Sequence, residues 1–139
     1  MKHWIILFTP ETYEAVKKLG TIGVRANVWK AFSEGMAKGD RFIGYVSKKM
    51  LFDAIGTIAS DATFEEKQIF PGDKLFPCRR KIAFEKTGLN APSGDLFHGI
   101  APFNEIGCGP GNYLMCKGGF AEIDKANFEW LLKQLSQKR

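Results

Sequence analysis

One arginine stands beside valine and alanine in a corner of the chain, within residues 20–32 (GTIGVRANVWKAF). Arg25 follows a Gly-Val pair, and aromatic residues come close behind it. A guanidinium in such a place can stack on a planar ring or pair with a phosphate. The alternative is a salt bridge to a nearby carboxylate such as Asp40, which would only hold the corner. Asn27 also has two interpretations, because its amide can bind the edge of a base or cap a following helix.

The chain carries no pattern of a known catalytic or metal centre. It lacks a nucleophile elbow, a zinc-protease helix, a phosphate-binding loop and a dinucleotide fingerprint. His3 and His98 are the only histidines, and Cys78, Cys108 and Cys116 form no CxxC pair. We therefore expect reduced cysteines, no metal and no cofactor.

A formal net charge of +5 favours a polyanionic partner such as nucleic acid, although many basic proteins bind none. Side chains alternate along a strand, so Arg80 is expected to face away from Arg79 and Lys81. The candidate contacts to a nucleic-acid backbone are Lys30, Lys48, Lys49, Arg79, Arg80 and Lys81.

The elements that must position these residues can be placed from hydrophobic periodicity and capping signals. Thr9 and Pro10 predict a helix start, and Asp124 predicts another near the C-terminus. Strands are expected at residues 2–8, 41–47, 51–60, 77–85 and 113–123, and helices at residues 10–19, 28–36 and 125–138. Residues 61–76 are expected to form a long connection.

This order of elements predicts an α+β fold. Strands so close in sequence usually pair antiparallel, which indicates a strongly curved, mainly antiparallel sheet or open barrel with flanking helices. The length of 139 residues fits a single domain, residues 1–139. The apolar run near the N-terminus is too short to span a membrane and lacks a cleavage pattern, so a cytoplasmic location without membrane association is expected.

Several short motifs follow one another from Met1 to about Glu85. They are KHW at 2–4, Pro10-Glu11, GVR at 23–25, Gly39-Asp40, Tyr45, AIG at 54–56 with the later Ser60, and Phe76-Pro77 followed by Arg79. In this order they resemble the EVE domain, a member of the PUA-like group related to the YTH modified-RNA readers. The C-terminal part fits through GGFAEI at 118–123 and the closing helix.

The resemblance implies a PUA-like pseudo-barrel with a small pocket for a modified base. EVE-like domains are associated with methylated cytosine in DNA, and YTH relatives hold an N-methylated adenine of RNA between aromatic side chains. Where the YTH readers have a tryptophan after the equivalent Gly-Val, this chain has Arg25, so the YTH cage is incomplete and its methyl-adenine specificity is not carried over. The pocket residues that the resemblance implies are Phe8, Thr9, Val24, Arg25, Ala26 and Asn27, with Phe70 and Phe76 across from them.

Three functions fit these observations. The favoured function is a non-catalytic module that binds a modified base in DNA or RNA through a pocket with a basic rim. The alternative is a small enzyme, similar to ASCH domains, acting on RNA or a modified nucleoside, with Lys30, Lys81 or Asp73 as contributors. The third is a protein-interaction module with a vestigial pocket, and no pattern in the sequence predicts an oligomeric state.

Overall fold

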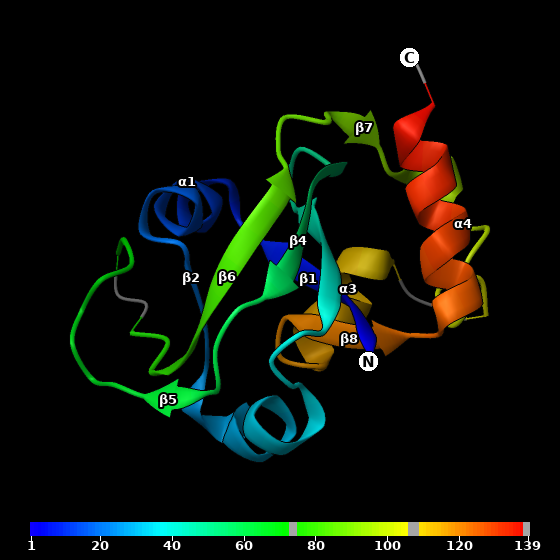
Figure 1. Ribbon diagram of the computed structural model, residues 1–139. Coiled ribbons are helices and arrows are strands. Elements are labelled where there is room, and N and C mark those ends of the chain that lie inside the picture. Colours follow the sequence, from blue (N-terminus) through cyan, green and yellow to red (C-terminus); the bar gives the residue numbers. More distant parts are fainter. Residues whose placement is uncertain (73–74, 106–108, 138–139) are drawn as a thin grey trace.

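The computed structural model describes residues 1–72, 75–105 and 109–137, and one curled sheet organises them. In this part of the chain the strands run in the order β2-β6-β4-β3-β1-β8, with β5 paired to β6 and β7 to β4 (Figure 1). The strands are β1 (His3–Phe8), β2 (Thr21–Val24), β3 (Arg41–Val46), β4 (Leu51–Ile58), β5 (Thr63–Phe64), β6 (Cys78–Lys86), β7 (Ala91–Pro92) and β8 (Phe120–Ile123). The strands β1 and β3 pair parallel and the other pairs are antiparallel. The predicted α+β fold with a curved, mainly antiparallel open barrel is confirmed.

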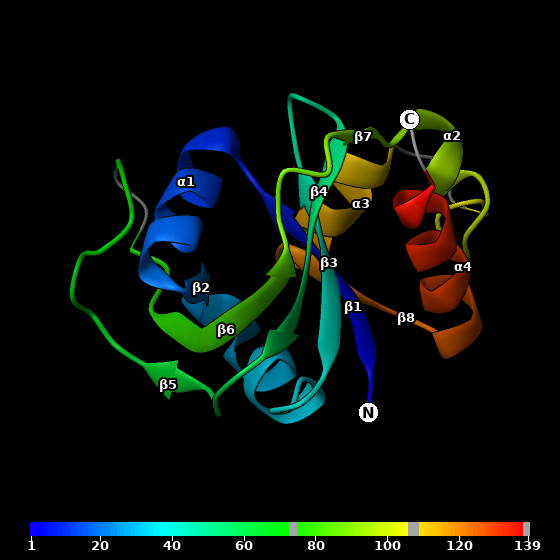
Figure 2. The ribbon, with the colours of Figure 1, turned by 45° about the horizontal axis from the view of Figure 1, so that its top comes forward.

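Helices cover both faces of this sheet. Helix α1 lies on the side of β2, and α4 lies against the opposite face (Figure 2). The helices are α1 (Pro10–Leu19), α2 (Gly94–Phe97), α3 (Pro110–Cys116) and α4 (Lys125–Ser136), with the short turns η1 (Ala26–Val28) and η2 (Ala31–Gly35).

The strand β1 lies between β3 and β8 and is buried on both faces, which explains its nearly continuous apolar sequence. Trp4, Ile6 and Phe8 point into one hydrophobic core, together with side chains of α1 and η2. Ile5 points into a second core, which the helices α2, α3 and α4 cover. Each fully buried side chain of this size contributes about 1.5–3 kcal/mol relative to exposure.

Helix α1 is held at both ends and on its buried face. The Thr9 hydroxyl accepts the N–H of Thr12 at 3.2 Å, and Gly20 ends the helix in the left-handed conformation that glycine adopts without strain. The Tyr13 hydroxyl donates to Asp53 Oδ2 of β4 at 2.8 Å. Burial, reinforced by the Asp53 carboxylate, raises the pKa of Tyr13 above its ordinary value. Helix α1 is therefore fixed against the sheet.

The local structure contains one strand that was not predicted and differs from two expectations. Residues 21–24 are the strand β2, because pairing with β6 supplies a long-range partner that local sequence cannot show. Asn27 does not cap a regular helix, since η1 is a 3₁₀ turn without a side-chain cap and η2 is a π-helix. Residues 110–116 form α3 with Pro110 at its first turn, so only Phe120–Ile123 of the strand expected there exists.

A candidate ligand-binding cavity

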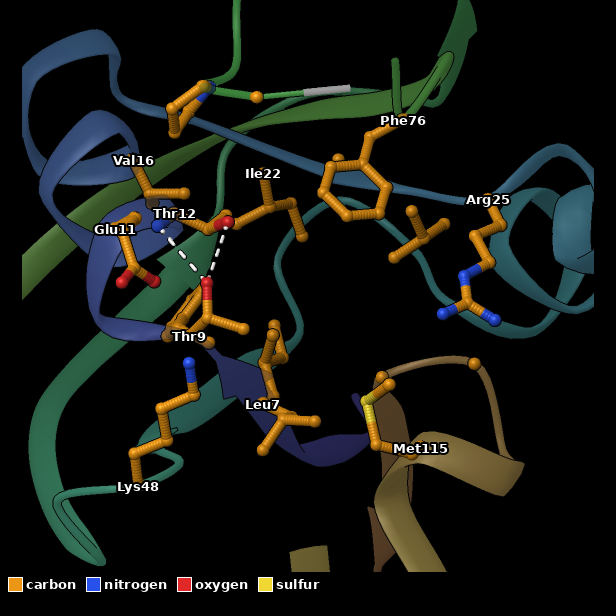
Figure 3. Close-up of a pocket in the computed structure, with 18 residues that line it drawn as sticks. Leu7, Thr9, Glu11, Thr12, Val16, Ile22, Arg25, Lys48, Phe76 and Met115 are labelled. Atoms are coloured by element: carbon orange, nitrogen blue, oxygen red, sulfur yellow. Dashed lines mark hydrogen bonds between the residues drawn. The ribbon is translucent and has the colours of Figure 1, made fainter. Parts of the chain in front are cut away.

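A cavity of about 650 Å³ opens where the curled sheet does not close on itself. The end of β1 and helix α1 line one side, and the edge strand β2 lines the other (Figure 3). The segment before β8 and the loop between β5 and β6 complete the wall. The volume lies within the range of about 300–1,000 Å³ that is typical of small-molecule pockets.

The walls of the cavity are mainly apolar. Phe76 and Ile22 project from one wall, and Leu7 and Met115 project from the opposite wall (Figure 3). Phe76 is partly buried, and Met115 is 47% exposed at the rim. An aromatic face among aliphatic side chains suits a planar, partly apolar ligand.

Three charged side chains surround this apolar space. Arg25 lies at one end of the cavity, and Lys48 and Glu11 lie at the other (Figure 3). All three are exposed, and none forms an ion pair or side-chain hydrogen bond within residues 1–72, 75–105 and 109–137. Their charges are therefore available to a ligand.

The salt bridge that could have tied Arg25 to Asp40 does not form, and that interpretation is wrong. The buried Asp40 carboxylate instead accepts the N–H of Lys2 at 3.0 Å, the indole N–H of Trp4 at 3.0 Å and the N–H of Ala37 at 2.9 Å. Burial alone would raise the pKa of Asp40, but these hydrogen bonds outweigh it and hold the pKa below its ordinary value.

Gly23 allows two phenylalanines to approach β2 closely. A Cβ atom at this position would lie 2.4 Å from Cε2 of Phe70 and 2.8 Å from Cβ of Phe76, so a larger residue would collide with both. The two rings meet edge to face with centroids 5.7 Å apart. Phe76 has a φ of +45°, a left-handed conformation that costs a non-glycine residue about 1–3 kcal/mol.

The structure brings most of the predicted pocket residues together. Those that line the cavity are Phe8, Thr9, Val24, Arg25 and Phe76.

The other predicted pocket residues lie close to the cavity but do not line it. Ala26 and Asn27 are exposed beside it, and Phe70 is buried behind Phe76. Lys48, a candidate contact to a nucleic-acid backbone, also lines the cavity. Lys30 and Lys81, the possible contributors to catalysis, are not among the lining residues. Asp73 and Cys108 lie outside the described residues.

The expected backbone contacts separate into exposed lysines and buried arginines. Arg79 is 2% exposed and Arg80 is 3% exposed, so the expectation that both meet phosphates at the surface was wrong. Each guanidinium instead donates to main-chain carbonyl groups inside the protein. The side chains of Arg79 and Arg80 point in opposite directions, as strand alternation predicted. The exposed candidates are Lys30, Lys48, Lys49 and Lys81.

Sequence reasoning missed the contribution of residues 115–119. Met115, Gly118 and Gly119 line the cavity, although about ninety positions separate them from Arg25. The main-chain N–H of Leu7 donates to the carbonyl of Gly119 at 2.8 Å, which fixes this segment beside β1. The Gly-Gly pair was a visible turn signal, but nothing in the sequence indicated what it would face.

Two further features concern the described residues as a whole. In residues 1–72, 75–105 and 109–137, no three or more His, Cys, Asp or Glu side chains gather where they could hold a metal ion. No helix within those same ranges combines the length and apolar character needed to cross a lipid bilayer.

Comparison with solved structures identifies similar folds. The Pho92 YTH domain in complex with m6A superposes with a TM-score of 0.75 at 12% identity, covering 99% of this chain and 85% of that chain. A complex of the YTH domain-containing protein mmi1 with RNA superposes with a TM-score of 0.70 at 18% identity, covering 96% of this chain and 80% of that chain. A crystal structure of a Pseudomonas syringae protein superposes with a TM-score of 0.63 at 19% identity, covering 96% of this chain and 99% of that chain.

Sequence comparisons give no such likeness. No protein-family model matches the chain, and no curated protein does. The expected relation to the YTH domains is confirmed for the fold, whereas the narrower EVE assignment stays a prediction. The curled sheet, its helices and the strand order thus give this chain the fold of the YTH domains, a PUA-like open pseudo-barrel.

Proposed function

We propose that this protein binds a modified base of a nucleic acid in the cavity between β1 and β2, without catalysing its conversion. One observation carries the proposal: an open cavity with apolar walls and an aromatic face has Arg25 and Lys48 at its rim, and neither cation has a partner in the described residues. A base has flat apolar faces and polar edges, and the nucleotide that carries it is flanked by phosphates. The cavity offers a partner for each of these features.

Each part of such a ligand has a matching residue. Stacking of a base on an aromatic ring such as Phe76 is worth about 1–3 kcal/mol. Arg25 would pair with a phosphate or stack on the opposite face of the base, and Lys48 would neutralise a second phosphate. The Glu11 carboxylate would accept a hydrogen bond from an exocyclic amino group.

The remaining candidates take secondary roles. Phe8, Thr9 and Val24 would contact the base, and Phe70 would support Phe76 from behind. Ala26 and Asn27 would lie beside the entrance. The exposed lysines would contact the backbone of the strand, namely Lys30, Lys49 and Lys81.

The solved structures of similar fold support this choice of ligand class, because they include a YTH domain bound to m6A and one bound to RNA. Those ligands belong to those proteins. We propose for this chain the broader class of a modified base in DNA or RNA, and propose that the chain is a single EVE-like domain.

Titration with matched modified and unmodified single-stranded oligonucleotides tests the function. The protein should bind more weakly as salt rises, because phosphate contacts release counterions. Arg25→Ala should weaken binding by about tenfold and reduce the slope of log affinity against log salt by about 1. Lys133→Ala removes a charge from α4 and serves as the control, because Lys133 is exposed and does not line the cavity.

Two outcomes would contradict the proposal. Undetectable binding of every oligonucleotide at low salt would exclude a nucleic-acid ligand. Turnover of a modified nucleoside beyond one equivalent, lost in Arg25→Ala or Phe76→Ala, would favour the enzyme alternative.

A further inference from the structure

The loop between β5 and β6 forms one wall of the cavity although it has little regular structure. It contributes Pro71, Gly72 and Phe76 to the lining. Such a segment needs contacts from outside itself to keep a ring in a fixed position. The described residues of this loop accept hydrogen bonds from a buried side chain of β6, that of Arg79.

Arg79 joins the two ends of the loop. Its Nε donates to the carbonyl of Phe76 at 3.1 Å, and its Nη2 donates to the carbonyl of Leu75 at 3.0 Å. Nη2 also donates to the carbonyl of Lys67, which lies near the other end. The guanidinium carbon lies 5.6 Å from the centroid of the Phe70 ring.

These contacts surround the strained residue Phe76. Arg79 binds the carbonyl groups of Leu75 and Phe76, which lie on either side of the backbone torsion of +45°. Phe70, under the same guanidinium, fills the space beside Gly23 and contacts the Phe76 ring edge to face. An unfavourable torsion persists only where its surroundings hold it.

We propose that Arg79 is a positioning residue for the ligand: it holds the loop so that Phe76 presents its ring to the cavity. The inference rests on the proposed function, since it assigns Phe76 as the stacking face. It also replaces the expectation that Arg79 contacts a phosphate, because its guanidinium is buried and occupied by three carbonyl groups.

Two substitutions separate positioning from phosphate contact. Arg79→Lys keeps the charge but loses the planar fork that reaches several carbonyls at once, and Arg79→Gln removes the charge. We expect both to weaken modified-oligonucleotide binding by about tenfold per folded molecule, with an unchanged salt slope. Wild-type affinity in Arg79→Lys, or a slope lowered by about 1 in Arg79→Gln, would overturn the inference.

A double-mutant cycle tests whether Arg79 acts through Phe76. In a Phe76→Ala background, Arg79→Lys should change affinity by less than about twofold, because the ring to be positioned is gone. Fully additive losses would overturn the inference. Arg80→Lys is the matched control, since Arg80 is equally buried on the same strand but donates to carbonyls of other segments. It should leave affinity per folded molecule unchanged.

A measurement without ligand keeps this inference separate from the proposed function. Amide hydrogen exchange in residues 65–77 should rise in Arg79→Lys, while exchange in α4 stays as in the wild type. If exchange in residues 65–77 does not rise, positioning by Arg79 is wrong whatever the protein binds. If it rises and no oligonucleotide binds the wild type, the proposed function fails while the positioning stands.

Discussion

Arg79 and Arg80 are neighbours on β6, yet they support two very different regions. Arg80 donates to the carbonyl of Phe32 at 2.9 Å and to that of Ser60 at 2.9 Å, and it lies 5.2 Å from the centroid of the fully buried Phe32 ring. Arg79 supports a loop that faces an open cavity. On one face of the strand the buried guanidinium of Arg80 therefore lies in a closed core, and on the other face the buried guanidinium of Arg79 binds a loop that borders a cavity.

The two regions also differ in how their charges are satisfied. On the side of Arg80, Asp40 accepts three hydrogen bonds from its own chain. On the cavity side, Arg25, Lys48 and Glu11 have no partner in the described residues. Charges satisfied internally maintain the fold, whereas charges left at the rim of an apolar cavity are available for binding. Substitutions in the two regions should therefore affect stability and binding differently.

The largest effect is expected at Arg80. Arg80→Met should lower the free energy of unfolding by roughly 2–4 kcal/mol, because the carbonyl groups of Phe32 and Ser60 lose their buried donor. Urea denaturation measures the change, with Lys133→Met on α4 as the control. Equal stability of wild type and Arg80→Met would show that Arg80 does not hold the closed region together.

A second test concerns the boundary of the cavity. Gly23→Ala should destabilise the protein by about 1–3 kcal/mol and weaken ligand binding, because the added Cβ meets Phe70 and Phe76. Gly94→Ala is the control, since a Cβ there has no atom within 4 Å. A Gly23→Ala protein with unchanged stability and affinity would contradict the close packing of this wall.

The pH dependence of stability should report the closed region through Asp40. Its pKa is lowered in the folded state, so its stabilising contribution is complete above the unfolded value of about 3.9 and is lost as the pH falls through the folded value. Asp40→Asn should cost about 1 kcal/mol at neutral pH, and less as the solution is acidified. Urea titrations at several pH values measure this, and a cost independent of pH would argue against an ionised Asp40.

The smallest effect on stability is expected at Arg25. Arg25→Ala should change the free energy of unfolding by less than about 0.5 kcal/mol, because the exposed guanidinium has no partner in residues 1–72, 75–105 and 109–137. A thermal melt beside the oligonucleotide titration checks both properties. A clear loss of stability with unchanged affinity would show that Arg25 stabilises the fold and does not contact the ligand.

Local signals predicted the elements whose boundaries depend on neighbouring residues. Thr9, Pro10 and Gly20 define α1, and Asp124 accepts the N–H of Asn127 at 2.7 Å at the start of α4. The apolar run of β1 predicted its burial, and the motif around residues 23–25 pointed to one wall of the cavity. The helix starts and the burial of β1 were accessible because capping, turn formation and apolar periodicity act over a few residues, whereas the wall at residues 23–25 was implied by the resemblance to the EVE domain.

Pairing and burial over long distances were not accessible in this way. Nothing near residues 21–24 indicated that they would pair with β6. Nothing near Arg79 or Arg80 indicated which carbonyl groups would accept hydrogen bonds from their guanidinium groups. Their charge alone made both arginines look like surface cations. Their burial depends on main-chain oxygens of segments distant in sequence.

The sequence by itself determined the class of fold, the positions of α1, α4 and β1, and an arginine at a glycine-rich corner. The tertiary structure alone decided that β2 and the segment around Met115 to Gly119 face each other across a gap, and that Arg79 turns inward to hold Phe76. This division has a physical reason: local conformational preferences determine the backbone only within a single turn, helix or strand. The curl of the sheet decides which distant side chains enclose a cavity and which buried donors find acceptors.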